Sequence, residues 1–190
     1  MNKRVIVELI ASWGDGGLEK HYIDLCNGIA DRGHRVIAIH PHDVQIPLVA
    51  GVEKRPLDMS GWRYSPVTAM RLLRLIRAVQ PDAVHAQAGR AATLLSLIKP
   101  WLKQPTLATV HNQKKTTRPY LSANQIIAVS KRALDFLPRN ANAVAIYNGV
   151  ETPAPNSTIN LLDLFSTKRP TILLHCCRYI AIADSGALKP

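Results

Sequence analysis

Acidic, aromatic and cysteine residues are all scarce in this sequence. Of its 190 residues, 13 are acidic against 24 lysines and arginines, and aromatic residues make up 5%. Its three cysteines, two of them adjacent, form neither a disulfide framework nor a set with metal-ligand spacing, which favours a reducing compartment. Because no apolar run reaches the ~20 residues that a membrane-spanning helix needs, the sequence predicts no such helix.

The N-terminal stretch MNKRVIVELIAS has the basic start and the apolar run of a signal peptide. However, Glu8 interrupts the apolar run, and glycines follow it in place of a small-residue cleavage site. We therefore expect residues 5–10 to form the first strand of a cytoplasmic protein.

The excess of positive charge is clustered. Arg71, Arg74 and Arg77 recur at a spacing of three in a predicted helix, and a second basic cluster lies between Lys99 and Arg139. Such clusters favour an anionic partner, which can be a phosphate, an acidic membrane or a nucleic acid; a basic solvated surface is the alternative. The few aromatic side chains argue against a nucleic acid, because single strands are bound by stacking on exposed rings.

Apolar segments typical of buried strands alternate with segments of helical periodicity along the chain. This alternation predicts an α/β fold with a doubly wound, mainly parallel sheet. Strands are predicted at residues 5–10, 36–40, 52–59, 83–87, 106–111, 125–130 and 143–150. Helices are predicted from residue 18 to Gly33, at 65–79, at 91–102 with Trp101 on the buried face, and at 131–137 with Ser130 as N-cap.

In a doubly wound sheet, ligands bind beyond the carboxyl ends of the strands. The segments that follow the predicted strands are therefore the candidate site. They are residues 14–19, 40–43, 87–90, 111–115, 130–132 and 148–151.

The first of these segments is a glycine-rich loop with Gly14, Gly16, Gly17 and then Glu19. A dinucleotide-binding fingerprint would have glycine in place of Glu19, and a phosphate-binding P-loop would continue with Gly-Lys-Ser/Thr. What remains is a turn whose backbone N–H groups, at the N-terminus of a helix, favour an anion, and whose glycines let a phosphate or a sugar approach the backbone. A tight turn without a ligand is the alternative.

Several spaced motifs resemble those of family 4 glycosyltransferases of the GT-B fold. They are GDGGLEKHYIDLCNGIADRGHRVIAI, DAVHAQAG, TLATVHN, QIIAVSKRALDFL and VAIYNGVE, which follow one another in the order of the family over residues 4–151. The resemblance implies a Rossmann-like N-terminal domain that binds the acceptor. It also implies a C-terminal domain that holds most of a nucleotide-sugar donor, with reaction in the cleft between the two.

The resemblance also implies roles for particular residues. Gly16 and Gly17, with Glu19 in the same motif, would lie against the diphosphate or the sugar of the donor. His111 would be the catalytic residue that faces the transferred sugar, unless it only caps its strand through a hydrogen bond. The remaining substrate contacts implied are Asn112, which is otherwise a loop residue, Ser130, which is otherwise a helix cap, and Arg178, which would grip the donor diphosphate.

No metal and no cofactor are expected beside the nucleotide diphosphate sugar that serves as donor substrate. His40, His42 and Asp43 offer three ligand types within four residues, but no fourth ligand stands out. The sequence also has no Asp-x-Asp motif.

The C-terminal part departs from the family pattern. TILLHCCRY matches the first strand of the donor domain, but Cys177 stands in place of a glycine, Ala183 in place of a lysine, and the paired glutamates are missing. We therefore expect an acceptor-binding domain at 1–168 and a stub of the donor domain at 169–190, through which the chain could self-associate.

The resemblance thus implies a retaining glycosyltransferase for an envelope polysaccharide, lipopolysaccharide or other glycolipid acceptor. We expect it to be cytoplasmic, either free or peripheral on the inner face of the membrane, and inactive as this truncated chain. The alternative is a non-catalytic Rossmann-like domain that binds an anion or a membrane surface.

Overall fold

The computed structural model describes residues 3–14, 16–62, 64–112 and 116–149. The chain divides into two units after Asn148, and the fold below is that of the first unit. The predicted domain boundary at 168, Arg178 and the predicted self-association through 169–190 lie outside the described residues.

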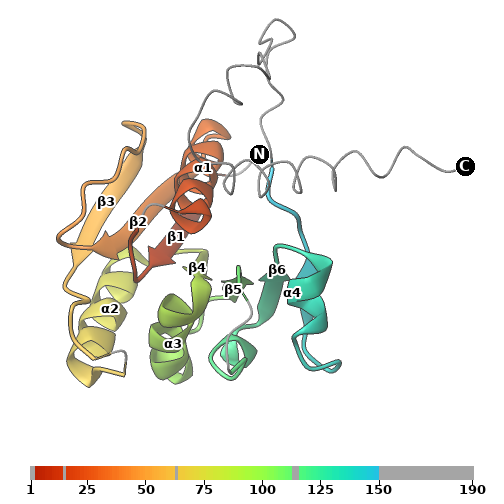
Figure 1. The fold of residues 1–190 in the computed structure, drawn as a ribbon. Helices are drawn as coiled ribbons and strands as arrows, with labels where there is room; N and C mark the ends of the chain where they lie inside the picture. The colour runs from red at the N-terminus through yellow and green to blue at the C-terminus, as the bar shows by residue number, and fades with distance from the viewer. Residues whose placement is uncertain (1–2, 15, 63, 113–115, 150–190) are drawn as a thin grey trace, which may run out of the picture. The chain divides into compact units, whose positions relative to one another are not determined.

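The first unit contains one seven-stranded sheet in the order β3-β2-β1-β4-β5-β6-β7, in which every neighbouring pair is parallel (Figure 1). This confirms the predicted doubly wound α/β fold, with residues 5–10 inside the sheet. The strands are β1 (Val5–Ile10), β2 (Arg35–Pro41), β3 (Val52–Leu57), β4 (Ala83–Gln87), β5 (Thr106–Val110), β6 (Gln125–Ala128) and β7 (Ala143–Ala145).

Three of the four predicted helices begin and end within two residues of the predicted positions, whereas the helix predicted at 91–102 is observed at 88–98. The helices are α1 (Gly17–Asp31), α2 (Pro66–Val79), α3 (Ala88–Ile98) and α4 (Lys131–Asp135), with 3₁₀ turns at η1 (Lys99–Trp101) and η2 (Tyr120–Ser122). Ser130 caps α4 by accepting a hydrogen bond from the Ala133 N–H at 3.1 Å, as predicted. Gly33 follows α1 with a φ of +82°, a left-handed conformation that glycine adopts without strain.

Helices cover both faces of the sheet. α2 and α3 bury the face that carries Leu9 and Val84, while α1 places Tyr22 and Cys26 against the opposite face. Strands that are covered on both sides need apolar residues on both sides, which explains the near-continuous apolar runs in the sequence.

Two sequence predictions need correction. Trp101 is 59% exposed and not in the core, because the α-helical register ends at Ile98 and the 3₁₀ turn η1, which contains Pro100, turns its residues to other directions. The strand predicted at 143–150 ends at Ala145. Among the described residues, no helix is both long enough and apolar enough to cross a bilayer.

Candidate functional site

The glycine-rich loop joins β1 to α1 at the carboxyl end of the sheet. Its Gly16 N–H donates a hydrogen bond to Glu19 Oε2 at 3.2 Å, which closes the first turn of α1. A Cβ atom on Gly16 would lie 3.1 Å from the same oxygen, whereas a Cβ atom on Gly17 would meet nothing within 4 Å. Gly16 therefore makes room for the Glu19 carboxylate, and Gly17 presents open backbone at the start of the helix.

A row of buried polar side chains crosses the sheet beneath this loop. Glu8 on β1 lies opposite His85 on β4 in the strand register, and Gln87 follows two residues later on the same face. Thr109 on β5 lies opposite Gln87. Each of these four residues is at most 6% exposed, so their polar groups depend on one another for hydrogen bonds.

The Glu8 carboxylate is the common acceptor of this polar row. His85 Nδ1 lies 3.1 Å from Glu8 Oε1, and Gln87 Nε2 donates to Glu8 Oε2 at 3.2 Å. On the other side of the His85 ring, Nε2 lies 2.7 Å from the Thr109 hydroxyl. Every buried side-chain polar atom of the row therefore has a partner, the condition under which such groups are tolerated in a core.

His111 connects the polar row to the surface. It follows β5 directly, its ring is partly exposed, and its Nε2 lies 2.9 Å from Gln87 Oε1. The edge of its ring meets the ring of His21, with the two centroids 5.0 Å apart. Since His21 lies one helical turn beyond Gly17, this contact joins the glycine loop to the end of β5.

Burial, and to a smaller extent the neighbouring His21 and His85, together lower the pKa of His111 from 6.5 to about 4. Burial also lowers the pKa of His21. His111 is therefore a neutral imidazole at neutral pH. It can exchange hydrogen bonds with a ligand, but it does not bring a positive charge to the site.

A strained turn aims Gln87 into the row. The chain passes from β4 to α3 with no intervening loop, and Ala88 has a φ of +62°, a left-handed conformation unusual for alanine. Such strain costs of order 1–2 kcal/mol and is concentrated at functional sites.

Arg90, in the first turn of α3, donates to the carbonyl groups of Met59 and Gly61.

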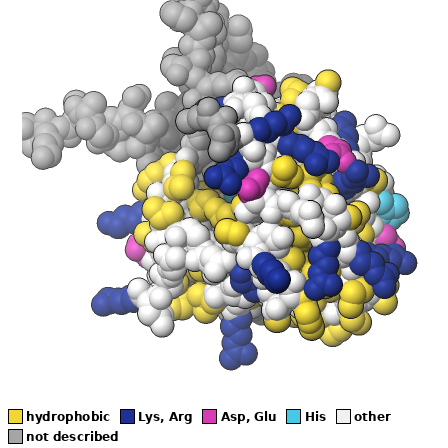
Figure 2. All heavy atoms as spheres, turned by 180° about the vertical axis from the view of Figure 1, so that it is seen from behind, with side chains coloured by type: hydrophobic (Ala, Val, Ile, Leu, Met, Phe, Trp, Pro, Cys, Tyr) yellow, Lys and Arg dark blue, Asp and Glu magenta, His cyan; other side chains and the backbone are white. Residues whose placement is uncertain are grey.

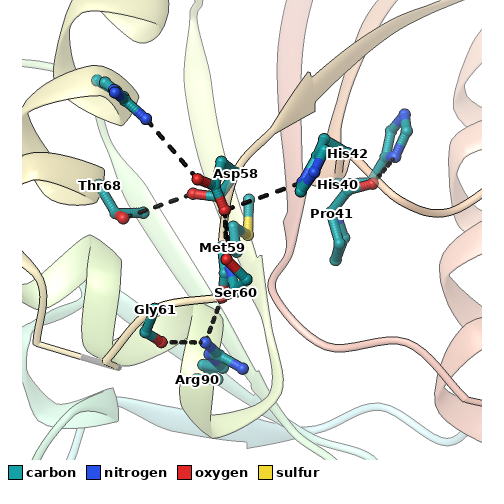
Figure 3. A network of polar contacts seen from close by, with 10 residues as sticks. His40, Pro41, His42, Asp58, Met59, Ser60, Gly61, Thr68 and Arg90 are labelled. Carbon is teal, nitrogen blue, oxygen red and sulfur yellow. Dashed lines mark hydrogen bonds and ion pairs between the residues drawn. The ribbon is translucent and has the colours of Figure 1, made fainter.

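A second polar cluster surrounds Asp58 at the end of β3 (Figure 3). The Ser60 hydroxyl donates to Asp58 Oδ1 at 2.7 Å, and the Ser60 hydroxyl and backbone N–H lower the pKa of this exposed carboxyl. His42 Nδ1 lies 3.9 Å from Asp58 Oδ1, and Arg71 Nη1 lies 3.9 Å from Asp58 Oδ2. Next to this cluster, Trp62 is 70% exposed and packs edge-on against Tyr64, so the loop before α2 presents both polar and aromatic surface.

Positively charged side chains continue from this cluster along α2. Arg71, Arg74 and Arg77 are exposed, as the helical spacing predicts. Arg77 donates to the backbone carbonyl of Trp101 at 3.4 Å, so the two exposed tryptophans, Trp62 and Trp101, lie near opposite ends of α2. Figure 2 shows lysine and arginine side chains spread over one face of the molecule with few acidic side chains between them.

The other predicted residues differ in their surroundings. Asn112 is exposed, and Ser130 caps α4. His40 is buried; its Nδ1 lies 2.8 Å from the Pro41 carbonyl oxygen, and its Nε2 has no hydrogen-bond partner within the described part of the chain. In the same part of the chain, no three histidine, cysteine or acidic side chains are grouped so as to hold a metal ion.

The sequence reasoning missed Glu8, His85, Thr109 and His21 and placed Gln87 only within a candidate segment. A usable signal was present, because an acid inside the apolar strand VIVELI and the alternating polar pair in AVHAQ both mark polar groups on a buried face. What the sequence does not reveal is that the two strands are neighbours with Glu8 opposite His85.

Comparison with known proteins identifies relatives of this chain. The mannosyltransferase that acts on phosphatidyl-myo-inositol in Mycolicibacterium smegmatis is 25% identical over 179 residues, covering 83% of this chain and 46% of that protein. A glycosyltransferase from Rickettsia africae has a similar structure, with a TM-score of 0.62 and 21% identity, over 96% of this chain and 50% of the other.

Two further structures share the fold. Sucrose-phosphate synthase from Thermosynechococcus elongatus has a TM-score of 0.64 at 11% identity, over 79% of this chain and 49% of that one. Anabaena HepE, solved in complex with UDP-glucose, has a TM-score of 0.57 at 15% identity, over 78% and 44%. The chain thus spans about half the length of the relatives it matches. Residues 15–153 match the profile of Glycosyltransferase Family 4, and the chain belongs to that family.

Proposed function

We propose that this chain is the acceptor-side half of a glycosyltransferase that moves a hexose from a nucleotide diphosphate sugar with retention of its anomeric configuration. The observation that carries the proposal is the contact between His21 and His111, which brings the open backbone at Gly17 and a neutral imidazole to one edge of the sheet. Family membership and the UDP-glucose bound to HepE support a nucleotide sugar as the donor.

The donor diphosphate would lie against the N-terminus of α1. Unpaired N–H groups and the helix dipole there stabilise an anion by about 0.3–1 kcal/mol at exposed sites. Glu19 already accepts the hydrogen bond of Gly16 and carries charge of the same sign as a phosphate. The diphosphate would therefore approach Gly17 and not Gly16, and N–H groups fixed before the reaction would stabilise the negative charge on the leaving group.

The sugar would lie against His111. A neutral imidazole orients a hydroxyl group through a hydrogen bond without attracting the phosphates, so it separates the sugar from the diphosphate end of the donor. Asn112 and Ser130 would add polar contacts from the neighbouring strand ends.

The acceptor would be a glycan or glycolipid of the cell envelope, bound near an anionic membrane on its cytoplasmic side. Arg71, Arg74 and Arg77 would each contribute about 1 kcal/mol of attraction to anionic lipid, and Trp62 and Trp101 suit the membrane interface. Sedimentation with anionic vesicles at low salt tests this. Replacement of the three arginines by glutamine should release the chain, and equal binding to neutral vesicles would contradict the proposal.

The decisive experiment measures transfer and hydrolysis of a panel of nucleotide sugars by the chain alone and after addition of a complementing C-terminal half. We expect no turnover by the chain alone, because donor and acceptor must be held together in one closed cleft, and turnover in the mixture. His111→Ala should abolish it, while His34→Ala, at the opposite edge of the sheet beside β2, should not.

Robust turnover by the chain alone would contradict the assignment of the donor to another half. Vesicle binding without any effect of nucleotide sugars would favour a non-catalytic membrane-binding domain instead.

A further inference from the structure

We propose that Glu8 and Gln87 are positioning residues for His111, which they hold as the tautomer with its proton on Nε2, so that Nδ1 is left to accept a hydrogen bond from a hydroxyl group of the sugar. The identity of the ligand rests on the proposed function. The tautomer rests only on the contacts between these side chains.

The first step is the orientation of the Gln87 amide. A carboxylate only accepts hydrogen bonds, and Glu8 Oε2 lies 3.2 Å from Gln87 Nε2. Turning the amide over would place its carbonyl oxygen against the carboxylate and leave the NH₂ group without that acceptor. Both side chains are 1% exposed, so water does not compensate for this loss, and Gln87 is held with Oε1 toward His111.

The second step is the proton on His111. Gln87 Oε1 has no hydrogen to donate, so its 2.9 Å contact with His111 Nε2 is a hydrogen bond only when Nε2 carries the proton. Burial and the neighbouring histidines lower the pKa of His111 to about 4, so the ring has one proton at neutral pH. With that proton on Nε2, Nδ1 has a lone pair.

The other branch of the polar row, formed by His85 and Thr109, agrees with this assignment. Glu8 Oε1 accepts from His85 Nδ1–H, and His85 Nε2 lies 2.7 Å from the Thr109 hydroxyl. The protons on His85 Nδ1 and Gln87 Nε2 thus point directly to the Glu8 carboxylate, and the proton on His111 Nε2 points to it through Gln87. One buried acid therefore orients the protons that both histidines direct into the polar row.

The Nε2–H tautomer of His111 determines which ligand groups can bind at its Nδ1. Within the described residues, His111 Nδ1 has no hydrogen-bond partner, and the ring is partly exposed. A lone pair accepts from the O–H of a sugar but is repelled by a phosphate oxygen, so the tautomer favours a hydroxyl group over the diphosphate at this point of the site.

Nitrogen NMR of the imidazole rings tests the inference on the 190-residue chain itself. The chain has seven histidines, and His111→Gln assigns the His111 signals by their loss. In the wild type, His111 should show a protonated Nε2 and a lone-pair Nδ1. Gln87→Met, of similar length but without an acceptor, and Glu8→Gln, which lets the Gln87 amide turn over, should each move the ring toward the Nδ1–H tautomer.

Thr109→Val is the matched control. It removes a hydrogen bond from the other branch, so His85 signals should change while His111 keeps its wild-type tautomer. Circular dichroism verifies that each variant is folded. A wild-type His111 with its proton on Nδ1, or one that ignores Gln87→Met in a folded chain, would overturn the inference.

Addition of UDP-glucose together with the complementing C-terminal half separates the inference from the proposed function. An Nε2–H tautomer that depends on Glu8 and Gln87 supports the positioning role whether or not the sugar shifts Nδ1. If a panel of nucleotide sugars shifts no site resonance with the complementing half present, this counts against the function and leaves the tautomer in place.

Discussion

The two faces of β1 and β4 are equally buried but chemically opposite. Toward α2 and α3 the strands present apolar side chains such as Leu9 and Val84, and toward α1 they present Glu8, His85 and Gln87. The apolar face shows that these strands need no polar group to pack. A fully hydrogen-bonded polar row on the other face carries a desolvation cost without adding much stability, so we expect it to serve the proposed site.

The largest expected effect comes from breaking the polar row at its centre. Glu8→Ala should lower the free energy of unfolding by about 3–5 kcal/mol, because it leaves His85 and Gln87 buried without their acceptor. Leu9→Ala, on the apolar face of the same strand, should cost about 2–5 kcal/mol through its cavity. Denaturant titration measures both.

A combined replacement distinguishes the loss of hydrogen-bond partners in Glu8→Ala from a requirement of the fold for the polar row itself. Glu8→Met with His85→Leu, Gln87→Leu and Thr109→Val should recover most of the stability lost in Glu8→Ala, because no fully buried side chain of the polar row is left unpaired, yet it should abolish sugar binding. If the quadruple variant is as unstable as Glu8→Ala, the polar row is needed for the fold itself.

A smaller loss of stability should appear at acidic pH, and it should depend on residues of the polar face and not on those of the apolar face. The folded pKa of His111 is about 4, below its ordinary 6.5, so the unfolded chain binds the proton more readily. The contribution of His111 to the free energy of unfolding is therefore fully present above pH 6.5 and is lost as the pH falls toward 4. This loss amounts to at most about 3 kcal/mol.

His111→Gln should remove that share of the acid loss in denaturant titrations at several pH values. The pKa values of His21 and His40 are also lowered by burial, so His21→Gln and His40→Gln should remove further parts of the same slope. Leu9→Ala should lower the whole curve without changing the slope, and an unchanged slope in His111→Gln would contradict the burial of this ring.

A gain of about 1 kcal/mol is expected from Ala88→Gly, because glycine adopts the observed φ of +62° without steric strain. If the strain serves to aim Gln87, the variant should be more stable in thermal unfolding but bind nucleotide sugar less tightly, as the relaxed turn lets Gln87 move. Ala91→Gly, inside α3, is the control and should destabilise.

The smallest stability effects, a few tenths of a kcal/mol, are expected at the glycine loop. Gly17→Ala meets nothing within 4 Å and should leave folding nearly unchanged while weakening donor binding, because the new methyl group stands where the diphosphate would approach. Gly16→Ala presses on Glu19 and should disturb the helix cap with or without a ligand. Isothermal titration with a nucleotide sugar, in the presence of the complementing half, compares the two; wild-type affinity in Gly17→Ala would show that this loop is structural.

The sequence alone determined the class of fold, the positions of most strands and helices and, through its motifs, the family. These follow from local patterns. Continuous apolar strands require cover on both faces, Ser130 begins a helix through its side-chain cap, and Gly33 ends one through its left-handed backbone. The sequence also placed the glycine loop and His111 at the carboxyl edge of the sheet, because every strand of a parallel sheet ends there.

Only the tertiary structure decided how that edge is built. Strand order cannot be read from local pattern, so the pairing of β1 with β4, which places Glu8 opposite His85, had to be observed. The position of the Glu19 carboxylate also had to be observed; it occupies the space that the missing side chain of Gly16 leaves. Hydrogen bonds between side chains from different strands depend on register and distance, and these are set by the packing of the whole sheet.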